Sequence, residues 1–369
     1  MSEKKISPFE QKLNDWVSTH FSKISIVEKI FFVDHLRTML HAGLSLVEGL
    51  DILSKEAEKP VFKKTVLAIK AEIEKGTTFN EAMAMHPKFF PPLYVKMIAS
   101  GEIAGNLEET LAQVVLQMKK SHELTATIKG AMIYPSVVVT AIFAVGILMI
   151  TVVLPKIITL FTQFDAELPL ATRVLIATAK FFQKPLNMAV STVLFVSLIV
   201  GFVVGLKRSD AFKRRVHALN LRLPIAGGII KKINLARFTL TLSSLLKSTL
   251  PIIQAVENTA DTCGNVLYKN SLREVAEKLK SGNTLSEILR LYPALYPPMI
   301  TEMIMVGEKT GEMDRLLAEL ADFYNGEVDR TMKNFSTIIE PAIILLLGLG
   351  VAGIAVAVIS PMFKLMQSF

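Results

Sequence analysis

The sequence predicts an all-α membrane protein in which two homologous cytoplasmic helical bundles are combined with three transmembrane helices. Three long uncharged apolar runs and an internal repeat with a shift of 206 residues predict this fold class. Of the 369 residues, 51% are apolar and 20% are charged, and the mean hydropathy is +0.44. This composition excludes an ordinary soluble chain, because such a value requires runs long enough to cross a bilayer.

The apolar runs place the three membrane crossings at residues 131–154, 188–206 and 336–360. The uncharged stretches 131–154, 188–206 and 341–360 each have about 20 residues, which is the length a helix needs to cross about 30 Å of hydrocarbon. A buried helix of a soluble protein normally carries a polar face at this length, and these runs do not. The first and third runs hold Pro135 and Pro341 in what the sequence predicts to be the first helical turn, where free N–H groups tolerate proline.

The basic residues predict the orientation of the chain. Nine Lys and Arg residues lie between 207 and 237 against one acid, Asp210, whereas only four lie in the whole of 155–187. Since basic residues stay on the cytoplasmic side, the N-terminus is predicted inside and the C-terminus outside. Between the crossings lie a cytoplasmic tail (1–26), a first bundle (27–130), a periplasmic loop (155–187), a second bundle (207–335) and an outside tail (361–369).

Charge and cysteine content restrict the ligands and the compartment. The net charge is +8, but residues 1–130 hold 17 basic and 16 acidic residues, so the excess lies in the juxtamembrane stretch 207–237. There it serves topology and contact with the anionic lipid bilayer, which argues against nucleic-acid binding. The single cysteine, Cys263, excludes an intrachain disulfide and fits a reducing compartment. Residues 1–30 lack the apolar core of a secretory signal, so we expect the N-terminal domain to stay in the cytoplasm.

The internal repeat is the strongest feature of the sequence. Shifted by 206 residues, the chain brings leucines, glycines and prolines into coincidence without a gap. The coinciding pairs include Leu36 with Leu242, Gly76 with Gly282, Pro87 with Pro293, Gly101 with Gly307, and Pro135 with Pro341. The shift equates the first crossing with the third, so both copies enter the membrane in the same direction.

The spacing of apolar residues predicts a small helical bundle in each copy. In the first copy, helices are expected over 28–40, 44–54, 61–74 and 107–120. Thr78 and Thr284 each open a capping-box pattern, and the prolines that follow end this short helix and begin the next. The outside segment 155–185 is apolar with few charges and is predicted to form an amphipathic helical hairpin on the membrane.

Two glycine-rich motifs resemble nucleotide sites but lack the context of one. Residues 348–353 spell G-x-G-x-x-G inside an apolar run, where small residues favour close helix packing. The second, 307–311, lacks the complete phosphate-loop pattern, and no strand is predicted before it. We predict a structural or interaction role at tight helix–helix connections for the residues of the duplicated motif. These residues are Gly101, Glu102, Gly105, Gly307, Glu308 and Gly311.

No pattern predicts catalysis, a cofactor or a metal site. The six histidines are scattered, and neither a calcium loop nor a Ser-His-Asp arrangement can be proposed from spacing. Acidic residues on the domain surfaces leave open whether a divalent cation binds there. Any energy source must therefore be a partner protein.

Glu340 is the single residue that most invites a functional interpretation. It precedes Pro341 at the start of the third crossing. Acids at this depth are costly and often functional, which predicts that Glu340, with Pro341 and Pro135, contacts a partner helix in the membrane. The alternative is an acid at headgroup level near a helix N-terminus, where the helix dipole favours negative charge.

The chain resembles the type II secretion system F family, the inner-membrane platform proteins of bacterial type II secretion and type IV pilus assembly. The resemblance covers about residues 27–366. Its carriers are the duplicated G-E-x-x-G motif, residues 236–257, residues 316–329 (LLAELADFYNGEVD), Ile339-Glu340-Pro341, and the duplication with three crossings. The chain departs from the family at 32–35, where a polar F-x-R-Q-like opening is frequent. The short N-terminal extension favours a pilus-type machine over a secretion system.

The resemblance implies a homo-oligomeric platform without enzymatic activity in the bacterial cytoplasmic (inner) membrane. It implies a hexameric motor ATPase, pilin or pseudopilin subunits and other inner-membrane assembly proteins as partners. The alternative is a membrane subunit of a transporter driven by a separate ATPase. Three crossings without buried charges make a poor transport pathway, and a membrane enzyme would need a catalytic constellation that the sequence does not offer.

Overall fold

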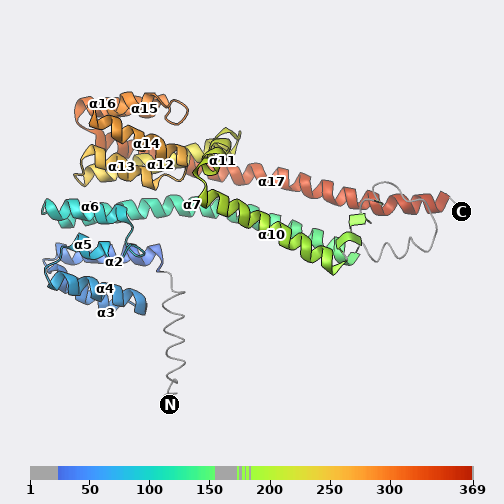
Figure 1. Ribbon diagram of the computed structural model, residues 1–369, viewed down its shortest axis with the longest axis horizontal. Helices are drawn as coiled ribbons and strands as arrows, with labels where there is room; N and C mark the ends of the chain where they lie inside the picture. The colour runs from blue at the N-terminus through green and yellow to red at the C-terminus, as the bar shows by residue number, and fades with distance from the viewer. Residues whose placement is uncertain (1–23, 154–172, 174–176, 179, 183, 368–369) are drawn as a thin grey trace, which may run out of the picture. The chain divides into compact units, whose positions relative to one another are not determined.

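Helices are the only regular structure in the described part of the chain. The computed structural model describes residues 24–153, 173, 177–178, 180–182 and 184–367, and none of these is in a β-strand (Figure 1). The predicted all-α fold class is therefore confirmed. The predicted hairpin at 155–185 lies largely outside the described residues.

The two copies of the repeat contain the same succession of helices. In the first copy these are α2 (Ile26–His41), α3 (Leu46–Glu56), α4 (Pro60–Glu74), α5 (Phe79–Ala84), α6 (Pro92–Ile103) and α7 (Leu107–Leu148). In the second copy they are α12 (Ala226–Lys247), α13 (Ile252–Thr262), α14 (Val266–Lys280), α15 (Leu285–Arg290), α16 (Pro298–Thr310) and α17 (Met313–Gln367). The bounds of α3, α4 and α5 coincide with those of α13, α14 and α15 after the shift of 206 residues, so the repeat is structural as well as sequential.

Side-chain caps and left-handed turns set the ends of these helices. Ser25 and Ser45 form capping boxes with the glutamate three residues on, and these two boxes were not among the sequence predictions. At the predicted sites, the Thr78 N–H donates to Glu81 and the Thr284 hydroxyl accepts from the Glu287 N–H, each at 3.4 Å. Local polar spacing therefore predicts the start of α5 and α15.

Three equivalent aromatic positions form the centre of each bundle. The rings are those of Phe32, Phe62 and Phe90 in the first copy and Phe238, Tyr268 and Tyr296 in the second. Both buried tyrosine hydroxyls are hydrogen-bonded, Tyr268 to the Leu295 carbonyl at 2.8 Å and Tyr296 to the Ser271 hydroxyl at 2.9 Å. Burial raises the pKa of both tyrosines above the ordinary range, so both keep their protons.

The last helix of each copy continues without a break into an apolar stretch. The continuous helix is 42 residues long in α7 and 55 residues long in α17. With α10 (Pro185–Arg208), these are the three helices of the described chain that are long and apolar enough to cross a membrane. They agree with the three predicted crossings.

Pro135 and Pro341 lie inside these long helices and not in a first turn. Each proline follows about eight turns of helix, because α7 begins at Leu107 and α17 begins at Met313. Since only the first N–H groups of a helix are free, the predicted reason for tolerating these prolines is wrong. The dipole interpretation of Glu340 is wrong for the same reason, as no helix N-terminus lies near it.

A further helix, α11 (Asp210–Arg222), follows α10 and was not predicted from the sequence. The Ser209 hydroxyl accepts a hydrogen bond from the Phe212 N–H at 3.3 Å and so caps the start of α11. The Phe212 ring packs edge-on against Phe202, with ring centroids 5.7 Å apart, and lies beside Gly205. The glycine thus makes room for an aromatic ring from the next helix.

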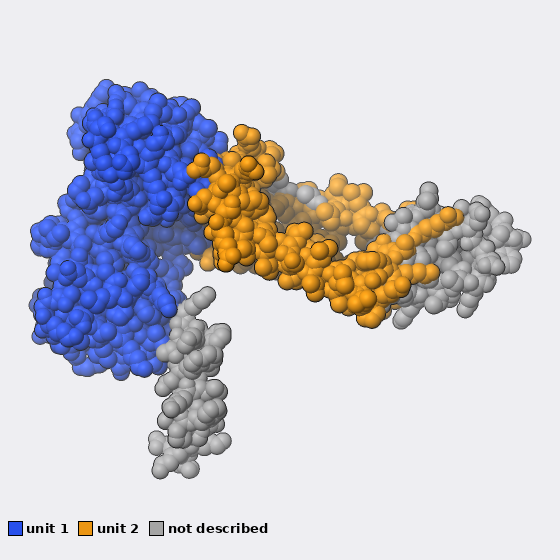
Figure 2. Space-filling view, in the orientation of Figure 1, with its two compact units in different colours: residues 1–125, 230–327 blue, residues 126–229, 328–369 orange. Residues whose placement is uncertain are grey.

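The chain forms two compact units (Figure 2). Unit 1 comprises residues 1–125 and 230–327 and contains both copies of the bundle. Unit 2 comprises residues 126–229 and 328–369 and contains the apolar helical segments. The assignment of particular segments to cytoplasm, membrane and periplasm stays a prediction.

Candidate functional site

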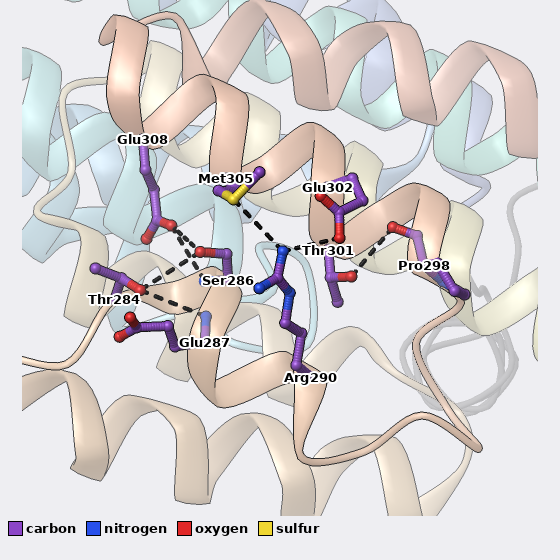
Figure 3. A network of polar contacts seen from close by, with 9 residues as sticks. All are labelled: Thr284, Ser286, Glu287, Arg290, Pro298, Thr301, Glu302, Met305 and Glu308. Atoms are coloured by element: carbon purple, nitrogen blue, oxygen red, sulfur yellow. Dashed lines mark hydrogen bonds and ion pairs between the residues drawn. The ribbon is translucent and has the colours of Figure 1, made fainter.

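In the second copy, the glutamate of the repeated motif caps a helix of its own bundle (Figure 3). Glu308 on α16 accepts hydrogen bonds from the Leu285 and Ser286 N–H groups at 2.5 and 3.2 Å, and the Ser286 hydroxyl also donates to it. These groups open α15, where a helix has unpaired donors and favours negative charge. The Glu308 carboxylate on α16 therefore caps the start of α15 and links the two helices by hydrogen bonds.

The first copy repeats this arrangement with one donor fewer. Glu102 on α6 accepts from the Phe79 and Asn80 N–H groups at 2.7 and 3.0 Å. Asn80 stands where the second copy has Ser286, and its side-chain oxygen accepts from the N–H of Glu81 instead. The cap is conserved between the copies, while its third donor is not.

The first glycine of each motif permits a close approach between helices. A Cβ atom at Gly101 would lie 2.0 Å from the Thr110 hydroxyl oxygen of α7. A Cβ atom at Gly307 would lie 2.8 Å from the Cα atom of Met313 in α17. Neither position has room for a side chain, so both corners require glycine for packing.

The last glycine of each motif turns the chain. Gly105 has φ +71° and Gly311 has φ +76°, the left-handed conformation that L side chains adopt only at a cost. Each ends its helix and directs the chain into α7 or α17. The motif is thus a helix-capping corner in both copies, and a role in partner binding stays a prediction.

The nucleotide-like motifs lie in helical surroundings. Residues 307–311 join α16 to α17, and residues 348–353 lie inside α17. In the described chain, no three His, Cys, Asp or Glu side chains are grouped so that they could hold a metal ion. Burial raises the pKa of the Cys263 thiol to about 12, which leaves it protonated and poorly nucleophilic.

The two copies contact each other within unit 1 through buried polar side chains. The Gln117 amide of α7 donates to the Thr241 hydroxyl at 3.2 Å and accepts from the Ser244 hydroxyl at 2.8 Å, both on α12. Gln117 is only 2% exposed. From α6, Lys96 donates to the side-chain oxygen of Asn258 on α13 at 2.5 Å. The contact is polar and, because it is buried, each group needs its partner.

Two further polar pairs add to this contact between the copies. Lys120 forms an ion pair with Asp322 at 2.5 Å, and the Ser100 and Thr249 hydroxyls lie 3.3 Å apart. Thr249 has φ +58°, which is unusual for a β-branched residue. The first copy contributes residues of α6 and α7, and the second contributes residues of α12, α13 and α17 and the turn before α13. The positions that one copy uses are not the repeat mates of those that the other uses, so the contact is heterologous.

A cleft of about 340 Å³ opens at this contact. Its wall includes Lys96 from the first copy and Arg237 and Asp261 from the second. The Lys269 ammonium, which lies 2.8 Å from the Asp261 carboxylate and donates to it, lowers the pKa of Asp261 below its usual range. At neutral pH the cleft therefore presents fixed charges of both signs.

The three candidate contacts in the membrane segments lie in different environments. Glu340 and Pro341 are exposed on α17, whereas Pro135 is buried on α7. Within the part of the chain that the structure describes, the Glu340 carboxylate has no hydrogen bond or ion pair. Its contact with a partner helix stays a prediction.

A family model described as "Type II secretion system (T2SS), protein F" matches residues 32–155 and again residues 238–361. The two matches are offset by 206 residues at their first and last positions, 32 against 238 and 155 against 361. The predicted repeat is therefore confirmed at the same register.

Relatives with assembly and secretion names match most of the chain. The type IV pilus assembly protein PilC of Myxococcus xanthus is 33% identical, over 91% of this chain and 80% of its own length. The PilC protein of Thermus thermophilus is 34% identical, over 90% and 81% respectively. The type II secretion system protein F of Vibrio cholerae is 28% identical, over 93% and 83%. With two family matches and relatives above 30% identity over nine-tenths of its length, the chain belongs to the type II secretion system F family.

Proposed function

We propose that this chain is an inner-membrane platform protein of a type IV pilus or type II secretion machine. The observation that carries the proposal is the match, over nine-tenths of the chain, to relatives named for type IV pilus assembly and for type II secretion. Three helices apolar enough to cross a membrane agree with a platform embedded in the bilayer.

A pilus machine is favoured over a secretion machine. Four relatives named for type IV pilus assembly are 30% to 34% identical, whereas three named type II secretion system protein F are 28%, 28% and 29% identical. A further relative, the type 4 fimbrial assembly protein PilC of Pseudomonas putida, departs from this order at 26%. All of these matches cover at least nine-tenths of the chain, so the difference does not come from alignment length.

The proposed mechanism couples a cytoplasmic hexameric motor ATPase to the assembly of pilin or pseudopilin subunits. The ATPase acts on the helical bundles, and the apolar helices hold the subunits that leave the membrane. Continuous helices support this coupling, because α7 and α17 each connect a bundle to an apolar segment without an intervening loop.

Identification of bound proteins tests the proposal. The tagged full chain is lightly crosslinked in its own cells, purified in mild detergent and analysed by mass spectrometry. Recovery of a hexameric motor ATPase together with pilin-like subunits is the expected result, and the pilin type names the machine. Recovery of a transporter ATPase or a solute-binding protein without pilins would overturn the proposal and favour a permease subunit.

The proposed orientation places the N-terminus and α11 in the cytoplasm. The excess of basic residues after α10 supports it. Alkaline phosphatase, which is active only outside the cytoplasm, is expected to be active when fused after residue 184 and inactive when fused after residue 222. The opposite pattern would reverse the orientation.

We also propose that Glu340 contacts a partner helix in the membrane, with Pro341 and Pro135 shaping the contact. An exposed acid on an apolar helix is costly unless a partner group or water satisfies it. Glu340→Leu is expected to abolish filament assembly while the protein level stays normal, and Glu340→Gln to retain part of it. Full assembly by Glu340→Leu would refute this contact.

A further inference from the structure

The contact between the two copies has a geometric consequence for the rest of unit 1. The first copy uses residues on α6 and α7, and the second copy uses its α12–α13 side together with Asp322 of α17. Because the copies have the same fold, each also possesses the side that its mate uses. The first copy therefore has an α2–α3 face, and the second an α16–α17 face, that correspond to an interface but do not form it within one chain.

Several exposed positions on these faces are apolar where the intrachain contact is polar, while Thr38, the mate of Ser244, and Glu302, the mate of Lys96, are polar as their mates are. Phe323 on α17 is the repeat mate of Gln117, and His35 on α2 is the mate of Thr241. Phe31, the mate of Arg237, stacks on the His35 ring with centroids 3.6 Å apart. Applying the shift to the Gln117–Thr241 hydrogen bond pairs Phe323 of one chain with His35 of another.

The same substitution of apolar for polar recurs along both faces. Val306 corresponds to Ser100, Ile52 to Asn258, and Leu116 to Asp322. Ile52 is only partly exposed. Leu116 lies on α7 and belongs to the first copy's face because its mate Asp322 contacts Lys120. Among the described residues of unit 1, five of the ten exposed large apolar side chains lie on the two faces. Those on the two faces, which are 42% to 55% exposed, are Phe31, Leu116, Met299, Val306 and Phe323.

Exposed apolar residues elsewhere in unit 1 provide a contrast. Met85 and Leu291 are mates of each other, are equally apolar and lie outside both faces. Scattered exposed apolar residues need no explanation, but a set that matches a known interface position by position indicates a covered surface. Aromatic residues and methionine are also the types enriched in protein–protein interfaces.

We propose that copies of this chain join head to tail, the α16–α17 face of one chain packing on the α2–α3 face of the next. Phe323 of one chain then lies against His35 and Phe31 of its neighbour, as Gln117 lies against Thr241 within a chain. The contact is heterologous, so it builds a closed ring or an open array and not a two-fold dimer. A ring of this kind contains an even number of bundles, with polar joints inside chains and apolar joints between them.

A second copy of this chain is the occupant that the observations favour. One chain carries both halves of the predicted joint, and the template for their packing already exists between its own two bundles. The inference rests on the repeat and does not depend on the proposed function.

Disulfide crosslinking between two differently tagged chains tests the joint. One chain carries His35→Cys, the other carries Phe323→Cys, and isolated membranes from cells that express both are oxidised. Native Cys263 can remain, because it is buried. The matched control pairs Met85→Cys with Leu291→Cys. Since an assembled joint holds its two thiols at millimolar effective concentration, we expect on the order of tenfold more mixed dimer from the 35–323 pair than from the control.

The result distinguishes the proposal from other assemblies. Mixed dimers from the 35–323 pair, with neither variant crosslinking to itself, support the head-to-tail joint. Dimers of His35→Cys alone or Phe323→Cys alone indicate a two-fold contact and overturn it. A 35–323 yield equal to the control overturns it as well.

A second measurement does not depend on crosslinking. Phe323→Gln gives the second copy the residue that its mate position carries, and Leu291→Gln makes the same kind of change off the face. We expect Phe323→Gln to shift the detergent-solubilised protein from oligomer to single chains in mass measurements, while Leu291→Gln leaves the mass unchanged. An unchanged oligomer with Phe323→Gln would overturn the proposal.

Discussion

The two copies of the bundle share their turns and caps but differ in the chemistry of their cores. The corner glycines and the capping glutamates coincide after the repeat shift. The aromatic centre does not, because Phe62 and Phe90 of the first copy are replaced by the hydrogen-bonded Tyr268 and Tyr296 in the second. The comparison indicates that turn residues set the fold, whereas a core position accepts either ring once its polar atom has a partner.

One turn departs from this agreement. The second residue after α2 is Gly43 with φ +87°, and its mate, the second residue after α12, is Thr249 with φ +58°. The second copy thus keeps the turn without the glycine that favours it. The Thr249 hydroxyl lies 3.3 Å from Ser100 of the other copy, so the residue that strains the turn also contributes to the contact between copies.

The largest expected effect comes from adding a methyl group at the first glycine of each G-E-x-x-G motif. Gly307→Ala and Gly101→Ala should each destabilise the protein by about 3 kcal/mol, because the new Cβ meets atoms of the next helix at less than 3.0 Å. Thermal unfolding of the full chain in detergent measures this loss. Gly130→Ala is the control, since no atom lies within 4 Å of its added Cβ. Equal behaviour of Gly307→Ala and Gly130→Ala would contradict the close approach.

Loss of the capping glutamate should destabilise the second copy more than the first. We expect Glu308→Ala to cost about 2 kcal/mol and Glu102→Ala about 1 kcal/mol, since Glu308 accepts from three donors and Glu102 from two. Denaturant unfolding of each variant checks the order. Ser286→Ala, which removes the third donor, should reduce the difference between the copies. Equal costs in the wild-type background would show that the third donor contributes nothing.

A substitution in the left-handed turn at Thr249 is expected to stabilise the protein, in contrast to the variants above. Thr249→Gly should stabilise the second copy by about 1 kcal/mol through relief of the strained φ, and Gly43→Thr should destabilise the first by a similar amount. Unfolding temperatures of the two reciprocal variants measure both effects. Ser100→Ala serves as a reference for loss of the hydroxyl contact alone. If Thr249→Gly lowers the unfolding temperature, the contact with Ser100 outweighs the strain.

The smallest expected effect concerns pH. In the first copy, hydrogen bonds from Lys55 and then Lys70 lower the pKa of Asp51 to about 2. A lowered pKa means that the pair stabilises the fold above pH 3.8, the unfolded value, and that this stabilisation is lost as the pH falls toward 2. The Asp51→Asn variant should therefore lose less stability than wild type between pH 4 and pH 2, as measured by unfolding midpoints at low salt. An identical loss of stability in both proteins would show that the interactions of Asp51 with Lys55 and Lys70 do not stabilise the fold.

The sequence was sufficient for the repeat, the three apolar helices and most helix bounds. These features depend on local signals, such as the proline pairs before α6 and α16 and the threonine caps of α5 and α15. The repeated G-E-x-x-G motif was predicted to form a tight connection between helices. Its glutamate, however, accepts a hydrogen bond from a residue 22 positions earlier, Asn80 in the first copy and Ser286 in the second, at the start of another helix. No spacing rule identifies such a partner.

Two other features escaped prediction for physical reasons. Apolar runs alone suggested that helices begin at the membrane, whereas α7 and α17 begin within the bundles. Gly130 is the kind of residue that commonly ends a helix, yet α7 continues through it. The contact between copies joins Gln117 to Thr241. A single polar residue on a helix does not reveal from sequence alone which residue it will bind. Its one signal was the mismatch between repeat mates, polar at 117 and aromatic at 323.

The prolines inside α7 and α17 have a consequence for the backbone of the two apolar segments. Pro135 has no N–H to donate to the carbonyl of Ala131, and Pro341 has none for the carbonyl of Thr337. In hydrocarbon, an acceptor without a donor costs several kcal/mol. Each copy therefore has, at the same repeat position of its apolar helix, a carbonyl without its helical donor, to which a hydroxyl, a water molecule or another chain's donor can supply the missing hydrogen bond.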